Sequence, residues 1–312
     1  MCYFCNAMRL ANARKPLVDN PAPVSSDTGR TLSATLRQGR RGFVHTVAAG
    51  AATATLGGWP QAHAQVEVGK ASSLRKLVPA GQLEAAADSQ YRQLLTEARQ
   101  QKALAPDNHP QLQQLRAIAQ HLIPHALPWN DRAKHWRWEV NLIASKQINA
   151  FCMPGGKIAF YTGILNDLKL STDESAMIMG HEMAHALREH ARERLAKTQA
   201  TGFGLSIGAR LLGLGDLGDI AANLGTKLLT LQFSREDETE ADLVGLELAA
   251  RAAYEPSASV SLWQKMTEVS GGSGGPGLNF LSTHPSGPAR IEALQANVPK
   301  VMNLYTQAKR GG

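Results

Sequence analysis

Apolar side chains recur at helical spacing in two segments of the first half of the chain. Residues 81–104 and 111–123 carry them three and four positions apart, which predicts two amphipathic helices. Residues 136–142 alternate between apolar and polar side chains, which indicates a strand. We expect two more strands at about 147–152 and 157–161, joined by a Pro-Gly-Gly turn.

Helical spacing also dominates the second half of the chain. Ser171 and Glu174 have the spacing of a capping box, which predicts that a helix begins there. The helices expected in this half span about 171–197, 234–253, 257–269 and 288–308. Together with three short strands, they predict a mainly helical α+β domain with a small mixed sheet.

The net charge of the chain is concentrated at its start. The 312 residues carry 33 basic and 26 acidic side chains, or +7. Residues 1–64 hold seven of these basic and two of these acidic groups, or +5, which leaves 26 and 24, or +2, for residues 65–312. A nucleic-acid surface requires its basic groups on the folded domain, and only 5% of the residues are aromatic. We therefore expect no nucleic-acid partner.

Residues 1–64 have the organisation of an export leader. Arg40-Arg41 precedes Gly, Phe and Val, a weakly apolar run covers 47–58, and Ala62-His63-Ala64 offers a cleavage site. The arginine pair resembles a twin-arginine export signal. We expect cleavage near Ala64, a single mature domain at 65–312 and a periplasmic location. A disordered basic arm is the alternative.

One motif carries the strongest indication of chemistry. The run His181-Glu182-Met183-Ala184-His185 lies within the helix expected at 171–197. Histidines four positions apart share one helix face, so both imidazoles can reach one Zn²⁺, and Glu182 can act as general base on a water there. On the wheel of a continuous helix His190 lies about 180° from His181, so we expect it to cap or pack near the helix end.

A catalytic zinc site requires a third protein ligand. The best source is the acidic helix that begins near Ser234, where Glu238 and Asp242 are four positions apart and share a face. Glu240 points about 200° away from Glu238. We expect Glu238 to bind the metal and Asp242 to accept the outer N–H of a ligating histidine. Gly245 permits close packing of this helix against the first. The alternative is a solvated acidic face.

Several motifs follow one another in a characteristic order. They are Asn149-Ala150, Pro154-Gly155-Gly156-Lys157-Ile158, Gly163-Ile164-Leu165, His181 to His185, Ser234 to Asp242, Ser282-Thr283-His284-Pro285 and Arg290-Ile291. In this order they resemble the HtpX-like and CAAX-prenyl-protease family of gluzincin zinc metallopeptidases, and most of all its soluble periplasmic BepA/LoiP-like branch. The resemblance implies a zincin-like domain, a metalloendopeptidase activity and one Zn²⁺ per chain.

The resemblance also implies roles for the outer motifs. The strand at Asn149 and Ala150 is expected to hydrogen-bond an extended peptide as an added strand. His284 is expected either to donate to the oxyanion or to approach the zinc and block its open position. Arg290 is expected either to stabilise the oxyanion or to pair with a nearby acid. The alternative for His284 is a histidine on a surface loop, and the alternative for Arg290 is a structural role.

The predicted function is a zinc-dependent endopeptidase for unfolded or misfolded envelope proteins, in protein quality control. The alternative is a periplasmic chaperone or assembly factor with a gated, rarely proteolytic zinc site. We expect extended polypeptides as substrates, with peripheral-membrane or outer-membrane assembly contacts as further partners. Residues 201–225, rich in Gly and Leu, are expected to form a lid, a membrane-leaning segment or part of the core.

Overall fold

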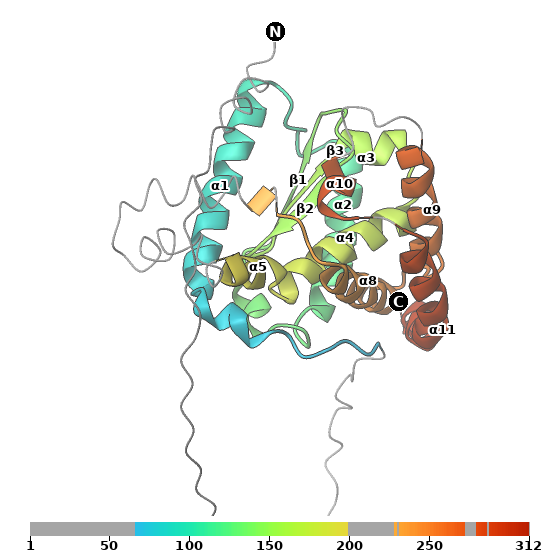
Figure 1. Ribbon diagram of the computed structural model, residues 1–312. Coiled ribbons are helices and arrows are strands. Elements are labelled where there is room, and N and C mark those ends of the chain that lie inside the picture. Colours follow the sequence, from blue (N-terminus) through green and yellow to red (C-terminus); the bar gives the residue numbers. More distant parts are fainter. Residues whose placement is uncertain (1–65, 199–227, 230, 272–278, 286, 312) are drawn as a thin grey trace, which may run out of the picture. The chain divides into compact units, whose positions relative to one another are not determined.

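Three short strands form a mixed sheet in the computed structural model (Figure 1). Strand β1 spans Glu139–Ile143, β2 spans Ala150–Met153 and β3 spans Lys157–Tyr161. Their order is β1-β3-β2, in which β1 pairs parallel with β3 and β2 pairs antiparallel with it, Cys152 opposite Ile158. Within this sheet β2 therefore lies at an edge.

The structure describes residues 66–198, 228–229, 231–271, 279–285 and 287–311. The leader expected at 1–64 and the lid or core segment expected at 201–225 lie outside them. No helix within the described residues combines the length and the apolar character needed to cross a membrane.

The turn between β2 and β3 depends on two glycines. Gly155 and Gly156 have φ angles of 85° and 77°, in the left-handed region that glycine adopts without steric cost. A Cβ on Gly156 would also lie 2.7 Å from ring atoms of Trp138, just ahead of β1. The predicted Pro-Gly-Gly turn is confirmed, and it returns the chain alongside β2.

Two long helices precede and flank the sheet. Helix α1 spans Ala80–Gln100 and packs against β2 and β3, and α2 spans Pro110–Leu122 and packs against β1. Helix α1 ends before the predicted residue 104, because Lys102 adopts a φ of 55° that a right-handed helix does not allow. Inside this layer the hydroxyl of Tyr91 donates to the backbone carbonyl of Ile158.

Short elements connect these parts. The 3₁₀ helix η2 lies in the segment ahead of α1, η3 and η4 lie between α2 and β1, and α3 follows β3. Their bounds are Ser73–Leu77 for η2, Ile123–His125 for η3, Asp131–His135 for η4 and Thr162–Asp167 for α3.

The helix predicted at 171–197 is in fact two helices. Helix α4 spans Thr172–Leu187 and α5 spans His190–Thr198. The break falls at Glu189, whose φ of 60° ends the right-handed helical path. The prediction of one helix was wrong because apolar spacing continues across the break and does not report a single left-handed residue.

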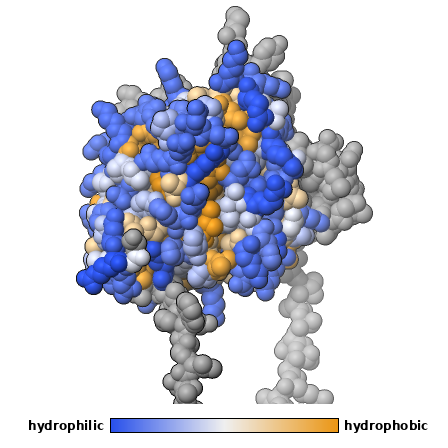
Figure 2. All heavy atoms as spheres, turned by 180° about the vertical axis from the view of Figure 1, so that it is seen from behind, coloured by the Kyte–Doolittle hydropathy of each residue, from blue (hydrophilic) through white to orange (hydrophobic). Residues whose placement is uncertain are grey.

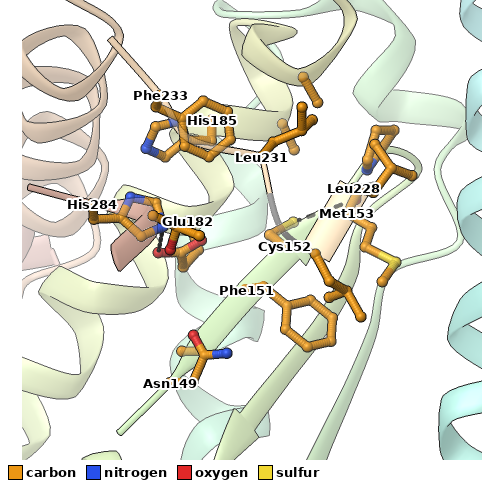
Figure 3. Close-up of a pocket in the computed structure, with 16 residues that line it drawn as sticks. Asn149, Phe151, Cys152, Met153, Glu182, His185, Leu228, Leu231, Phe233 and His284 are labelled. Carbon is orange, nitrogen blue, oxygen red and sulfur yellow. Dashed lines mark hydrogen bonds and ion pairs between the residues drawn. The ribbon is translucent and has the colours of Figure 1, made fainter. Parts of the chain in front are cut away.

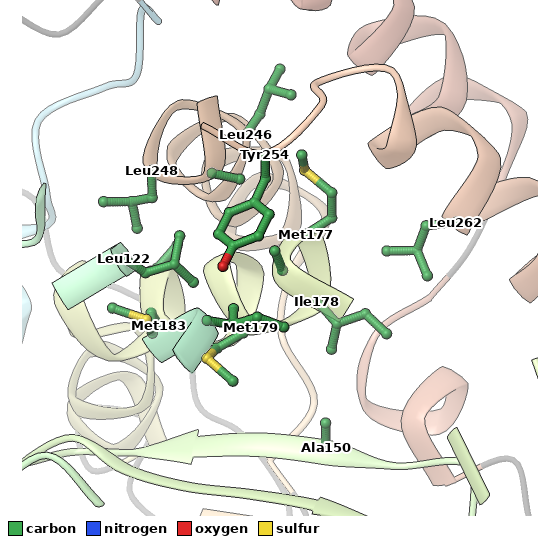
Figure 4. Packing of buried hydrophobic residues seen from close by; sticks show 14 of the residues in the cluster. Leu122, Ala150, Met177, Ile178, Met179, Met183, Leu246, Leu248, Tyr254 and Leu262 are labelled. Carbon is green, nitrogen blue, oxygen red and sulfur yellow. The ribbon is translucent and has the colours of Figure 1, made fainter. Parts of the chain in front are cut away.

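Helix α8 spans Arg235–Arg251 and packs backbone to backbone against α4. A Cβ on Gly180 would lie 2.8 Å from the carbonyl oxygen of Gly245, and a Cβ on Gly245 would lie 2.6 Å from the backbone nitrogen of His181. The close approach predicted from Gly245 is confirmed. Figure 4 shows the surrounding core, where Met177, Met179 and Met183 of α4 lie among apolar residues of several elements, Leu122, Ala150, Leu246, Leu248, Tyr254 and Leu262.

Three helices complete the described fold. Helix α9 spans Ala258–Gly271, α10 spans Asn279–Thr283 and α11 spans Pro288–Gly311. Helix α9 packs on α4, and α11 packs on both α8 and α9. The architecture is thus mainly helical with a small three-stranded mixed sheet, as predicted.

The face drawn in Figure 2 is mostly hydrophilic, with apolar residues showing between the polar ones. Large apolar side chains that are exposed within the described residues are Leu74, Leu77 and Leu127. Single exposed apolar residues are normal on a folded domain, so these positions require no partner to explain them.

Candidate metal centre

Helix α4 presents its two histidines from a firmly capped start. The Ser171 hydroxyl accepts from the backbone N–H of Glu174 at 3.1 Å, and the Glu174 carboxylate accepts from the Ser171 N–H at 2.8 Å, so the predicted capping box is confirmed. One turn apart on the same side of this buried helix, His181 and His185 bring their Nε2 atoms to 3.1 Å from each other. Burial lowers the pKa of His185 well below its ordinary value, which favours the neutral imidazole that a metal requires.

Helix α8 brings Glu238 to the same point. Ser234 caps this helix, as predicted, and its backbone N–H donates to Asp237 at 2.8 Å. The Glu238 carboxylate is 1% exposed and lies 3.6 Å from His181 Nε2 and 3.4 Å from His185 Nε2. Burial alone would raise the pKa of Glu238, but the neighbouring His284 and His185 lower it, so the carboxylate is ionised.

Asp242 and Arg290 lie behind the first histidine. Asp242 Oδ1 is 3.0 Å from His181 Nδ1, the contact expected of an acceptor for the outer N–H. Arg290 donates to both oxygens of Asp242 at 2.7 Å and lies 2.7 Å from Glu238 Oε2, with its guanidinium 3.5 Å from the Trp263 ring centroid. Of the two roles expected for Arg290, these contacts describe the pairing with acids.

His284 reaches the cluster from the end of α10. Its Nδ1 lies 2.9 Å from Glu238 Oε1 and 3.3 Å from His181 Nε2, and its Nε2 lies 3.6 Å from Glu182 Oε1. Burial would lower the pKa of His284, but the carboxylates of Glu182 and Glu238 raise it above its ordinary value. The side chain is therefore placed both for donation beside Glu182 and for approach to the histidine pair.

Glu182 is buried beside the edge strand β2. Burial raises the pKa of its carboxyl group, and the neighbouring His284 and His181 oppose that rise. The backbone of Cys152 in β2 also opposes that rise of the Glu182 pKa. A carboxylate with a raised pKa next to the metal-binding groups is suited to accept and return a proton.

A small cavity of about 50 Å³ lies between α4 and β2 (Figure 3). It has room for a few water molecules. Asn149 and Ala150 both line it, and Ala150 is also part of the buried core. Glu182, His185 and His284 also line the cavity, so the edge strand predicted to receive substrate adjoins the polar cluster. The other walls are apolar and include Phe151, Met153, Leu228, Leu231 and Phe233.

The donor set fits a metal ion. Ligand atoms offered by His181, His185, Glu238 and His284 all lie within 4.8 Å of one another, and all four side chains are buried. Ligand atoms around a tetrahedral zinc with bonds of about 2.0–2.1 Å are about 3.3 Å apart, close to the distances of 3.1, 3.4 and 3.6 Å among the first three residues. A buried group of two imidazole nitrogens and a carboxylate is chemically a metal site.

His190 is the residue at this site whose position the sequence did not reveal. The helical wheel placed it opposite His181, but the break at Glu189 turns α5 back toward the cluster. His190 Nδ1 lies 3.0 Å from His185 Nδ1. Packing near the helix end, as expected, is thus combined with a direct contact to the candidate ligand. The pattern of apolar positions does not indicate a single left-handed residue, so this contact could be found only from the structure.

Comparisons with known proteins agree with this geometry. A family model described as Peptidase family M48 matches residues 110–298. The mitochondrial metalloendopeptidase OMA1 of Schizosaccharomyces pombe is 38% identical over 165 residues, which cover 53% of this chain and 48% of the relative. Metalloprotease LoiP of Escherichia coli is 26% identical over 216 residues, covering 67% and 80%. The beta-barrel assembly-enhancing protease of Escherichia coli is 28% identical over 184 residues, covering 54% and 36%.

These matches confirm the resemblance carried by the sequence motifs. The matched regions span only 48%, 35% and 50% of the OMA1 proteins of Schizosaccharomyces pombe, Arabidopsis thaliana and Saccharomyces cerevisiae. The family model, in contrast, covers more than half of this chain and includes the two histidines, Glu238 and His284. The chain therefore belongs to Peptidase family M48.

Proposed function

We propose that the protein is a zinc-dependent endopeptidase that hydrolyses peptide bonds of unfolded or misfolded envelope proteins. The observation that carries this proposal is the convergence of His181, His185 and Glu238 beside the buried Glu182 and the edge strand β2. Several relatives are named metalloendopeptidase or metalloprotease, which supports the same reaction here.

His181, His185 and Glu238 are the residues that would hold the zinc. When bound, zinc supplies Lewis-acid polarisation of water and of the scissile carbonyl. Glu182 accepts a proton from the attacking water and returns it to the leaving amine nitrogen. The Nε2 atom of His284, 3.6 Å from Glu182, faces the same side and is positioned to donate to the oxyanion.

The edge position of β2 supports an extended substrate. Its neighbour within the described sheet is β3, so the other side of β2 offers backbone groups for a peptide to pair with as an added strand. The adjoining cavity is small and lined mainly by apolar side chains. A chain segment must be extended to align there, which favours unfolded or misfolded polypeptides over compact ones.

A periplasmic location with export by the twin-arginine route is part of the proposal. Its support is the Arg40-Arg41 motif with the cleavage site at Ala64. Expression in a bacterium should yield a mature chain that begins at Gln65. Replacement of both arginines by lysine should leave the uncleaved precursor inside the cell. Normal processing of that variant would contradict the export route.

The decisive test of the reaction is Glu182→Gln. This variant keeps the two histidines and Glu238, so it should bind one zinc per chain by elemental analysis but lose cleavage of casein, an unfolded protein. Removal of zinc from the wild-type protein with a chelator should abolish the same cleavage, and added zinc should restore it. Undiminished cleavage by Glu182→Gln would contradict the proposal.

A chaperone or assembly factor with a gated site is the second candidate. It is favoured by one observation, the position of His284 Nδ1 only 2.9 Å from Glu238 and 3.3 Å from His181, among the groups that would hold the metal. A chaperone should suppress aggregation of an unfolded protein with Glu182→Gln as well as with the wild type, and the wild type should leave casein intact. An endopeptidase gives the opposite result in the casein assay.

A further inference from the structure

The outer nitrogen of His185 meets another histidine instead of a carboxylate. His185 Nδ1 lies 3.0 Å from His190 Nδ1, and His190 Nε2 lies 3.3 Å from Glu240 Oε2. The two histidines are only 3% and 2% exposed. An imidazole that binds a metal through Nε2 carries its proton on Nδ1, and that N–H requires an acceptor. His190 is the acceptor in place.

His185, His190 and Glu240 form a row of hydrogen-bonding groups, and one set of proton positions satisfies all three. His185 donates from Nδ1 to the bare Nδ1 of His190, which then carries its own proton on Nε2 and donates it to Glu240. Burial would raise the pKa of the Glu240 carboxyl, but hydrogen bonds from His190 and Arg188 lower it, so Glu240 remains an ionised acceptor. Arg188 Nε holds the same carboxylate oxygen at 2.8 Å.

The local fold keeps these rings in register. The left-handed residue Glu189 turns the chain so that His190 begins α5 beside the end of α4. The rings of His185 and His190 meet edge to face, with centroids 4.9 Å apart. Phe233 packs against His185 with a centroid distance of 4.0 Å. A ring enclosed in this way has little freedom to adopt another orientation.

The corner between α4 and α5 is also tied to the segment that precedes α1. Arg188 donates to the backbone carbonyl of Gly69, and Arg75 forms an ion pair with Glu189 at 2.8 Å. Arg192 donates to the carbonyl of Val78. Arg188, which holds Glu240 at the outer end of the row, is therefore itself held by a segment far away in sequence.

We propose that His190, held by Glu240, is the positioning residue of His185: it accepts the Nδ1 proton and so presents Nε2 to the metal. The proposed task is the one expected of Asp242, which lies 3.0 Å from Nδ1 of His181. The inference rests on the proposed function in one respect, that His185 is a metal ligand.

Zinc affinity tests this role directly, without reference to catalysis. The apparent zinc dissociation constant of His190→Leu, measured by competition with a chromophoric chelator, should rise about 10- to 100-fold, as is typical when a hydrogen-bond partner of a ligand is lost. The absorption bands of the cobalt-substituted protein should also shift. His190→Gln, whose side-chain carbonyl can accept the same proton, should recover most of the affinity.

Glu193→Gln is the matched control. Glu193 lies on the same helix, is also buried, and forms its ion pair with Lys197 at 2.6 Å. It should keep the wild-type dissociation constant and cobalt spectrum. A folded His190→Leu protein with those same wild-type values, even one with a lower urea midpoint, would overturn the inference and leave His190 a packing residue.

Two further measurements separate the possible failures. If His190→Leu does not fold, Glu240→Ala decides, because it leaves both imidazoles in place: a raised zinc dissociation constant supports the row, and an unchanged one contradicts it. If the wild-type protein itself binds no zinc, the proposed function fails along with the inference. Zinc binding by the wild type with no change in either variant would remove the inference alone.

Discussion

His181 and His185 face the same carboxylate of Glu238, but their outer nitrogens meet different chemistry. His181 Nδ1 lies 3.0 Å from a carboxylate of Asp242, which a bidentate arginine neutralises. His185 Nδ1 lies 3.0 Å from a second imidazole, and the carboxylate comes one step later. The support of His181 is thus built from charged groups, and the support of His185 passes through the imidazole ring of His190.

The two supports also differ in burial. The side chains of Asp242 and Arg290 are 5% and 10% exposed, whereas that of Glu240 is 25% exposed. Charges deep in a protein depend on each other, since either one alone would be costly to bury. A carboxylate nearer to water loses less when its partner is removed. We therefore expect damage on the His181 side to affect folding, and damage on the His185 side to affect the geometry of binding.

The largest expected effect falls on the residue that both sides share. Glu238→Ala removes the carboxylate between the two histidines, so the protein should no longer retain zinc through a desalting step, as measured by elemental analysis. Glu240→Ala, two positions along the same helix, should retain zinc, with a reduced affinity. Loss of zinc in Glu240→Ala and retention in Glu238→Ala would make Glu240 the ligand, and the comparison of the two histidines would no longer hold.

Arg290→Met should have the next largest effect, and on stability. It leaves the buried carboxylates of Asp242 and Glu238 without their shared cation, so the free energy of unfolding of the metal-free protein should fall by about 3–5 kcal/mol in urea titrations. Arg188→Met removes the cation beside Glu240, which is 25% exposed, so it should cost less than Arg290→Met. Equal losses in the two variants would show that burial does not distinguish the two supports.

The first support was largely predictable from the sequence, and the second was not. Glu238 and Asp242 share one face of a continuous helix, so simple helical geometry predicted that both serve one metal site, but not which histidine Asp242 would meet. Most strands and helices were also predicted, because turn residues and caps such as Gly155, Gly156 and Ser171 mark their ends.

His190 lay beyond such reasoning for a physical reason. Its position depends on the backbone angle of Glu189, and a non-glycine residue in the left-handed region leaves no mark in the pattern of apolar positions. The contacts of Arg290 were likewise left between two roles, because α11 and α8 meet only through tertiary packing. The packing of separate helices against each other could not be predicted from the sequence.

Gly245→Ala should have an intermediate effect on both sides at once. The added Cβ would lie 2.6 Å from the backbone nitrogen of His181, so α8 must move away from α4 and carry Glu238 with it. We expect a loss of about 1–3 kcal/mol in the free energy of unfolding, together with weaker zinc binding. Gly287→Ala is the control, because a Cβ there meets nothing within 4 Å, and it should leave both quantities unchanged. Wild-type affinity in Gly245→Ala would show that the backbone contact does not set the ligand positions.

The smallest effect is expected at the start of α4, where Glu174 caps the helix that carries both histidines. Burial would raise its pKa, but Lys265 and the Ser171 N–H lower it below the ordinary 4.5, so the ionised cap stabilises the fold above pH 4.5 and this contribution disappears as the pH falls through the folded-state pKa. Glu174→Gln should therefore lose about 1 kcal/mol of unfolding free energy at pH 7 and progressively less below pH 4.5. A constant difference between the two proteins down to pH 3 would contradict an ionised cap. The cap contacts neither Asp242 nor His190. Its loss should therefore leave the hydrogen-bond partners of His181 and His185 unchanged, unlike a substitution of Arg290 or Glu240.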